Sequence, residues 1–322
     1  MLFRSIGIDS LAQSFAIGDT YVLSPTMVNS FRVAFNRTSS TRPGGQDYFS
    51  YCDAGVQNFW CGANPHFIGT LRVTGGFTMG TSFKEGNYNR PTSYNFTDDV
   101  NWIKGAHQLT FGVGWLHGRF NQWNNFASGG QLTFTSLANF MLGNVSQMFQ
   151  GLDNTHQIRD TLFNMYVTDT WKATSRLTVN VGVRWEPYFP QSVMNGSIFT
   201  FDINRYIAGI KSTQYTNAPP GFYYPGDPGF PGIKGVNTQM AHFTPRIGLA
   251  YDPMGDGKTS VRASYAFGYA FLPGIAHEDE GGSNPWGGRV TLATPVGGFL
   301  NSWQAQPGGN PYPYGVTKDV RF

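Results

Sequence analysis

Strict alternation of apolar and polar residues is the clearest pattern in this chain. Between residues 176 and 186 the apolar side chains occupy the odd positions: Leu177, Val179, Val181, Val183 and Trp185. The even positions carry only polar residues and glycine. A period of two places the two sets on opposite faces of a β-strand. Residues 259–271 repeat the pattern, so we predict two strands that each have one apolar and one polar face.

Six more segments alternate with some irregularity: 15–23, 30–36, 94–102, 108–115, 159–171 and 243–252. The eight segments form four pairs, and each pair is joined by a short stretch of turn-forming residues at 24–26, 105–106, 173–175 or 254–258. Long connections separate the pairs, at about 39–92, 120–157, 187–242 and 272–322. Short turns at one end of a sheet and long loops at the other are typical of an outer-membrane β-barrel. We therefore expect the long connections to be extracellular loops.

The polar face distinguishes a membrane sheet from a soluble one. It consists mainly of Gly, Ser, Thr and Asn, with few charges, which suits a wet barrel lumen better than the surface of a soluble sandwich. Four arginines are predicted to face this lumen: Arg32, Arg184, Arg246 and Arg262. Three aromatic residues lie near the predicted turns, at the depth where aromatic rings meet lipid headgroups: Trp102, Trp171 and Tyr251. Alternation alone leaves open a soluble β-sandwich that binds glycans through Tyr and Trp.

The composition supports the membrane interpretation. Aromatic residues make up 16% of the 322 residues and charged residues 13%, which is unlike a soluble helical protein or a disordered chain. The mean hydropathy is −0.28, and no run approaches the roughly 18 apolar residues of a membrane helix. The net charge is +3, without a cluster of basic residues, so no nucleic-acid partner is expected. Asp9 interrupts any apolar leader core, so we expect the chain to be a fragment or an internal segment.

Two features of the sequence concern individual residues. Cys52 and Cys61 have no metal-site spacing, and an exported protein favours a disulfide between them. Asp98 shares the apolar face with Val100 and Trp102, so a regular register directs it toward lipid. A β-bulge between Asp98 and Asp99 would remove this conflict, and the sequence leaves both arrangements open.

Chemical motifs are weak throughout the chain. Residues 277–280 combine a histidine with three carboxylates but lack the spacing of a calcium loop, so a solvated loop is favoured. Residues 255–259 lack the first glycine of a phosphate-binding loop, and a hairpin turn explains them better. A barrel enzyme remains an alternative, with Asp153, His156 and Asp160 as candidate catalytic residues, although no spacing supports it. We expect no enzymatic activity and no cofactor.

Several phrases resemble the barrel of TonB-dependent outer-membrane transporters, particularly the large Oar-like type. They are Tyr-Val-Thr-Asp-Thr-Trp-Lys-Ala-Thr-Ser-Arg-Leu-Thr-Val-Asn-Val-Gly-Val-Arg-Trp-Glu-Pro (166–187), residues 243–259, residues 23–32 and residues 102–112. The resemblance implies a plug domain, a barrel of about 22 strands, an energising TonB complex and import of a bulky nutrient. The chain shows no plug or TonB-contact segment.

The predicted fold is therefore all-β. We expect residues 1–322 to form one partial outer-membrane domain, an antiparallel transmembrane β-barrel segment of about eight strands. Polar-face residues such as Gly182, Gly248 and Ser264 are too small to fill a closed eight-stranded barrel. The sheet is accordingly expected to be open or incompletely closed.

Overall fold

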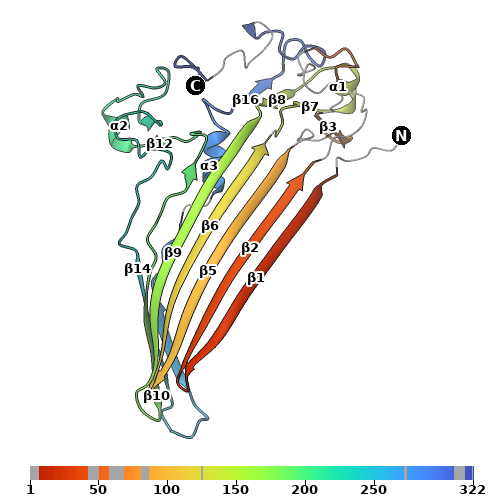
Figure 1. The fold of residues 1–322 in the computed structure, drawn as a ribbon. Helices are drawn as coiled ribbons and strands as arrows, with labels where there is room; N and C mark the ends of the chain where they lie inside the picture. The colour runs from red at the N-terminus through yellow and green to blue at the C-terminus, as the bar shows by residue number, and fades with distance from the viewer. Residues whose placement is uncertain are drawn as a thin grey trace.

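A computed structural model describes residues 7–42, 51–57, 69–80, 87–124, 126–271, 274–307, 316–320 and 322. One long antiparallel sheet, here called the main sheet, dominates the molecule (Figure 1). Its strands in spatial order are β1 (Asp9–Ser24), β2 (Met27–Thr41), β5 (Tyr88–Lys104), β6 (His107–Asn124), β9 (Asn154–Lys172), β10 (Leu177–Trp185), β14 (Phe243–Tyr251) and β15 (Val261–Ala266). The short β11 (Ser192–Val193) pairs with the start of β9.

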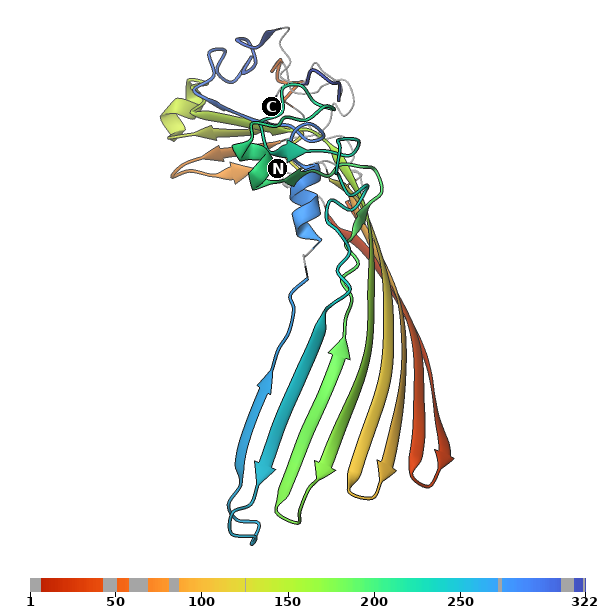
Figure 2. The same ribbon diagram turned by 90° about the vertical axis from the view of Figure 1, so that its left-hand side faces the viewer.

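The four predicted turns lie together at one end of the main sheet (Figure 2), as the alternation of short and long connections predicted. At the last of them, the Asp252 carboxylate accepts hydrogen bonds from the amides of Gly257, Gly255 and Met254 at 2.8, 2.7 and 3.2 Å. These bonds lower the pKa of Asp252. Gly255 and Gly257 have positive φ angles of 73° and 71°, so residues 252–260 are a hairpin turn and not a phosphate-binding loop.

The strand boundaries differ from the expected ones at the loop end. Strands β5 and β6 extend well beyond the segments in which apolar residues alternate, because the ladder continues through polar positions. By contrast β15 ends at Ala266, so the prediction of a strand to residue 271 was wrong. Pro245 on β14 has no amide hydrogen and offers only its carbonyl, which accepts from Phe267 at 3.1 Å. The regular ladder stops there.

Register gives the main sheet two distinct faces. On the apolar face, Val100, Phe111, Val167 and Val183 lie side by side on adjacent strands. On the polar face, Asp99, Gly112, Tyr166 and Arg184 form the next row. No second sheet packs on the apolar face among the described residues, and Val181 and Ile247 are 47% and 54% exposed.

The main sheet is open. β1 and β15 stand at the two ends of the strand order, and neither has a second neighbour among the described residues. The fold is all-β, the main sheet is antiparallel and its barrel is not closed, which confirms the predicted fold class. No helix in the described part of the chain has the length and hydropathy needed to span a membrane.

The long connections carry a separate sheet, here called the cap sheet, at the end opposite the turns (Figure 2). Its order is β16 (Arg289–Ala293), β8 (Gln147–Gly151), β7 (Gln131–Phe134), β3 (Thr70–Val73) and β4 (Thr78–Met79), and the helix α1 (Leu137–Met141) packs beside it. It has a buried core that includes Leu132, Phe134, Met148 and Trp303, whereas the main sheet takes part in a smaller buried cluster at its loop end, formed by Ile158, Val193 and Ile198.

After β11, the connection from β10 to β14 has short elements of its own. It contains β12 (Thr200–Phe201), α2 (Ile203–Ile207) and β13 (Phe222–Tyr223), and α3 (Ile275–Gly281) lies close to it (Figure 1). Tyr224 is almost fully buried and packs against the rings of Tyr215, Trp286 and Phe322. Edge-on and tilted aromatic contacts thus form a small core shared between this connection and residues after β15.

Candidate functional site

A row of polar side chains crosses the middle of the polar face. The hydroxyl of Tyr166 on β9 donates a hydrogen bond to Oδ1 of Asp99 on β5 at 2.6 Å. The Arg184 guanidinium on β10 lies 6.0 Å from the centre of the Tyr166 ring, and its Nε lies 2.5 Å from Oε1 of Glu186. Carboxylate, phenol and guanidinium therefore alternate across the strands, which is suited to polar recognition.

Two glycines make room for this row. A Cβ atom at Gly112 would lie 2.2 Å from Cε1 of Tyr166, so the ring lies directly over the glycine. A Cβ atom at Gly182 would lie 3.1 Å from Nε of Arg246 on the neighbouring strand. Glycines at these positions let large polar side chains lie flat on the sheet.

The structure brings two of the four predicted arginines together. Arg184 and Arg246 occupy adjacent rows of the adjacent strands β10 and β14. Arg32 lies on β2 at the other side of the sheet, and Arg262 lies near the turn before β15. All four share the polar face by register, and their position in a lumen stays a prediction.

Sequence reasoning missed Tyr166. An aromatic residue at a polar-face position runs against the alternation, so it was not included among the candidate lumen residues. Its neighbours on the same face, Asn164 and Thr168, were the available signal. An aromatic ring between two polar positions points to a specific role for its hydroxyl group.

A cavity of about 360 Å³ lies at the loop end of the polar face. The connections after β10 and β15 close it, through Gln191 and Gly274. Nε2 of Gln191 donates to Oδ2 of Asp160 at 3.4 Å, so the carboxylate faces this cavity. The other lining residues are Arg119 and a set of uncharged residues: Asn36, Thr38, Pro91, Thr92, Ser93, Gly118, Phe120 and Ile158.

The structure keeps two of the three candidate enzyme residues, Asp160 and His156, apart. Asp160 and His156 share a face of β9 but lie four residues apart, or about 13 Å along a strand. His156 is 1% exposed, and its Nε2 lies 3.1 Å from Oδ1 of Asn154. Burial lowers the pKa of His156, although the charge of Asp279 opposes this. Asp153 precedes β9 and takes part in other contacts.

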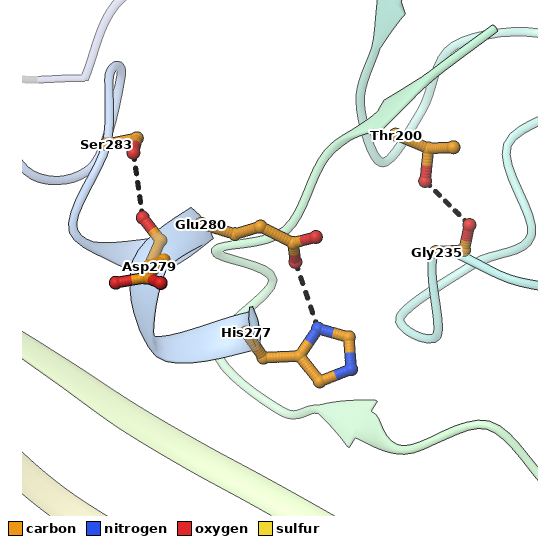
Figure 3. Close-up of polar contacts among 6 residues, drawn as sticks. All are labelled: Thr200, Gly235, His277, Asp279, Glu280 and Ser283. Atoms are coloured by element: carbon orange, nitrogen blue, oxygen red, sulfur yellow. Dashed lines mark hydrogen bonds and ion pairs between the residues drawn. The ribbon is translucent and has the colours of Figure 1, made fainter. Parts of the chain in front are cut away.

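Residues 277–280 are part of α3 and are not a solvated loop. His277 is 2% exposed, and its Nδ1 lies 2.9 Å from Oε2 of Glu280 (Figure 3). The solvated-loop prediction was therefore wrong for His277, because α3 packs against β9 and the connection before β14 and so covers the ring. A Cβ atom at Gly281 would lie 2.7 Å from Cε1 of His156, which shows how closely α3 approaches β9. The described residues contain no cluster of three or more metal-ligating side chains.

Of the two arrangements that the sequence left open at Asp98, the structure has the regular register without a β-bulge. The ladder continues without a shift, with Asp98 opposite Phe31 and Val113 and Asp99 opposite Ser30 and Gly112. Asp98 therefore lies on the apolar face, where Nδ2 of Asn29 donates to its Oδ1 at 2.6 Å.

The predicted interface aromatics share the apolar face near the turns. Trp171 lies opposite His107, and their rings stack at 5.6 Å. Lys104 lies 5.0 Å from the Trp102 ring, and Tyr251 lies opposite Leu177 beside the last turn. Their position at the headgroup level stays a prediction.

Cys52 packs against the core of the cap sheet, whereas Cys61 lies outside the described residues. The disulfide between them therefore also stays a prediction.

A comparison with known families matches residues 6–320 to the outer membrane beta barrel domain. The chain belongs to this family, which locates it in the outer membrane of a Gram-negative bacterium. This location excludes the soluble glycan-binding sandwich. A search of curated proteins found no match to this chain.

Proposed function

We propose that this chain is the barrel portion of a TonB-dependent outer-membrane transporter that imports a bulky nutrient. In this proposal the apolar face meets lipid and the polar face lines the lumen. The resemblance of residues 166–187 and 243–259 to such barrels supports it, as does the family to which the chain belongs.

The observation that carries the proposal is the combination of an open sheet with small polar-face residues. Eight strands closed on themselves would leave a lumen that glycine, serine and threonine underfill. In a wider barrel, a plug domain would occupy that space and contact the polar row of Asp99, Tyr166 and Arg184. The implied partners are therefore a plug, the energising TonB complex and a nutrient too large for passive diffusion. We propose no catalytic role for the chain.

The test is energised uptake in the native cell. Accumulation of labelled bulky nutrients (ferric chelates, corrinoids and oligosaccharides) is compared between cells with and without the gene. Each measurement is repeated after the proton gradient of the inner membrane is collapsed. We expect at least one nutrient to require both the gene and the gradient.

The same chain, purified and placed in a planar bilayer, is expected to give no steady conductance. Gene-dependent uptake that persists without the gradient would contradict the proposal. So would a stable closed pore formed by the chain alone, because both results indicate a passive channel.

A further inference from the structure

Four arginines lie together on the apolar face near the loop end of the main sheet: Arg37 on β2, Arg90 on β5, Arg119 on β6 and Arg159 on β9. We call this set the arginine band. Arg37, Thr92, Arg119 and Arg159 form one row across four strands, and Arg90 lies in the next row beside Asn121. Arg37, Arg90 and Arg119 are exposed.

The charges of the arginine band are not neutralised within the described chain. None of the four arginines forms an ion pair with a described residue. Arg119 and Arg159 face each other directly across two strands, and their guanidinium charges repel. Like charges in direct opposition destabilise a sheet unless an anion lies between them.

The distance of the arginine band from Trp102 along the membrane normal follows from strand geometry. Trp102 marks the predicted interface at the turn end, and Tyr94 lies eight residues further along β5. At a rise of about 3.3 Å and a tilt of about 40°, eight residues span about 20 Å of membrane. The rows of Thr92 and Arg90 then lie about 25 and 30 Å above Trp102, at the upper limit of an apolar band of about 25 Å.

Directly below the arginine band lies the mixed row of Phe35, Tyr94, His117 and Thr161, and the row below that is apolar: Val33, Phe96, Trp115 and Phe163. Phe35 packs on Tyr94 with a ring separation of 5.4 Å, and Trp115 stacks on His117 at 5.8 Å. The change from aromatic rows to arginines marks the level at which hydrocarbon gives way to headgroups. At this end the loops, and therefore the cell exterior, lie above the band.

We propose that the arginine band binds the phosphate groups of outer-leaflet lipid headgroups. Guanidinium groups suit this task because their planar donors bind phosphate in pairs. A phosphate between Arg119 and Arg159 would relieve their repulsion, while the acyl chains of the lipid would lie along Phe35, Tyr94 and Trp115. This inference rests on the assignment of the apolar face to lipid and not on transport.

The test is binding of fluorescent lipid A, which carries two phosphates, to the purified chain in dodecyl maltoside. The first variant is Arg119→Gln/Arg159→Gln, and the second is Arg37→Gln/Arg90→Gln. The matched control, Arg176→Gln/Lys258→Gln, removes two charges at the turn end. Each arginine near a membrane surface contributes about fivefold to binding, so each band variant is expected to bind about 30-fold more weakly. The control is expected to bind like the parent chain.

Two further binding measurements distinguish lipid-bound phosphate from free phosphate. Dephosphorylated lipid A is expected to bind the parent chain as weakly as phosphorylated lipid A binds the variants. Millimolar inorganic phosphate is expected to compete poorly, because it lacks the acyl chains. Circular dichroism identifies folded variants, and the second pair serves if the first does not fold.

Equal binding by the band variants and the control would overturn the proposal. Full competition by inorganic phosphate would also overturn it, since the site would then bind free anions and not lipid.

Discussion

The main sheet and the cap sheet place their apolar side chains in opposite surroundings. In the cap sheet Leu132, Phe134 and Met148 are 0% exposed, as in the core of a soluble protein. In the main sheet Phe15, Val181 and Ile247 remain about half exposed to the surroundings. Both sheets are built from hydrogen-bonded strands, so the difference lies in what covers their side chains. Protein covers the cap sheet, whereas lipid covers the apolar face of a membrane barrel.

This comparison separates two sources of stability. Loss of core packing should affect the cap sheet without removing the main sheet from the membrane. Loss of apolar character on the outer face should have the reverse effect. The predictions below test this separation, from the largest expected effect to the smallest.

Trp303→Ala is expected to have the largest effect. Trp303 is 1% exposed, and its Nε1 donates to Oε1 of the buried Gln150 at 2.8 Å. Removing the ring leaves a cavity and removes this hydrogen bond, which together cost about 3–5 kcal/mol. Hydrogen exchange in detergent should become faster in β7 and β8 but not in β6 and β9. Val296→Ala, at a residue that is 78% exposed, is the control and should change little.

If exchange in β6 and β9 rises together with exchange in the cap sheet, the two sheets unfold as one unit. That result would contradict the claim that the main sheet and the cap sheet have separate sources of stability.

Val181→Arg tests the apolar face of the main sheet. The neighbouring position, Asn180, lies on the polar face and is the matched site for the same substitution. An arginine facing lipid costs about 2–4 kcal/mol near mid-membrane, whereas one in a wet lumen costs little. The folding yield in lipid vesicles should therefore fall more for Val181→Arg than for Asn180→Arg. Equal yields would show that the two faces are wrongly assigned.

Asp227→Asn tests a polar core in the connection before β14. The buried carboxylate accepts hydrogen bonds from the Ser212 and Thr213 hydroxyls at 2.6 and 2.7 Å and from the Tyr224 amide at 2.9 Å. Burial alone would raise the pKa of Asp227, but these bonds outweigh it and lower the pKa. The substitution is expected to cost about 1–3 kcal/mol, because an amide oxygen accepts these bonds more weakly.

The pH dependence of the stability of this connection follows from the lowered pKa of Asp227. A depressed folded pKa stabilises the fold above the unfolded value of 3.8, and this contribution is lost as the pH falls through the folded pKa. Proteolysis of residues 203–224 by pepsin should therefore accelerate only below about pH 4 in the parent chain. Asp256→Asn, in the turn at the opposite end, should leave that rate unchanged. A connection that stays protected at pH 2 would contradict this role of Asp227.

The difference between the sheets also explains what the sequence could predict. A strand with one face in lipid alternates locally, so the pairs around residues 176–186 and 259–266 could be read without any tertiary knowledge. The core of the cap sheet could not be predicted, because Gln150 and Trp303 lie 153 residues apart in the chain and neither belongs to a periodic pattern. The adjacency of Arg184 and Arg246 depends on register across two strands. Tyr166 was missed because its ring breaks the alternation on which the prediction relied.

The smallest expected effect concerns the polar pair on the apolar face, Asp98 and Asn29. Asp98 lies four residues above Trp102, which is about 10 Å into the apolar band for a strand tilted by about 40°. The hydrogen bond from Asn29 offsets part of the cost of a carboxylate in lipid, but two valines would have no such cost and would favour the strand conformation. Asp98→Val/Asn29→Val should therefore stabilise the chain in vesicles by about 1 kcal/mol.

The single variants make this prediction sharper. Asn29→Val leaves the carboxylate without its donor and should destabilise the chain, whereas Asp98→Val removes the charge and leaves only a neutral amide unpaired. Urea unfolding in vesicles, arranged as a double-mutant cycle, measures the coupling between the two residues. A double variant less stable than the parent would show that Asp98 and Asn29 contact something other than lipid. The apolar face around β2 and β5 would then be a protein interface, and the contrast between a lipid-covered and a protein-covered sheet would hold only for the strands beyond β5.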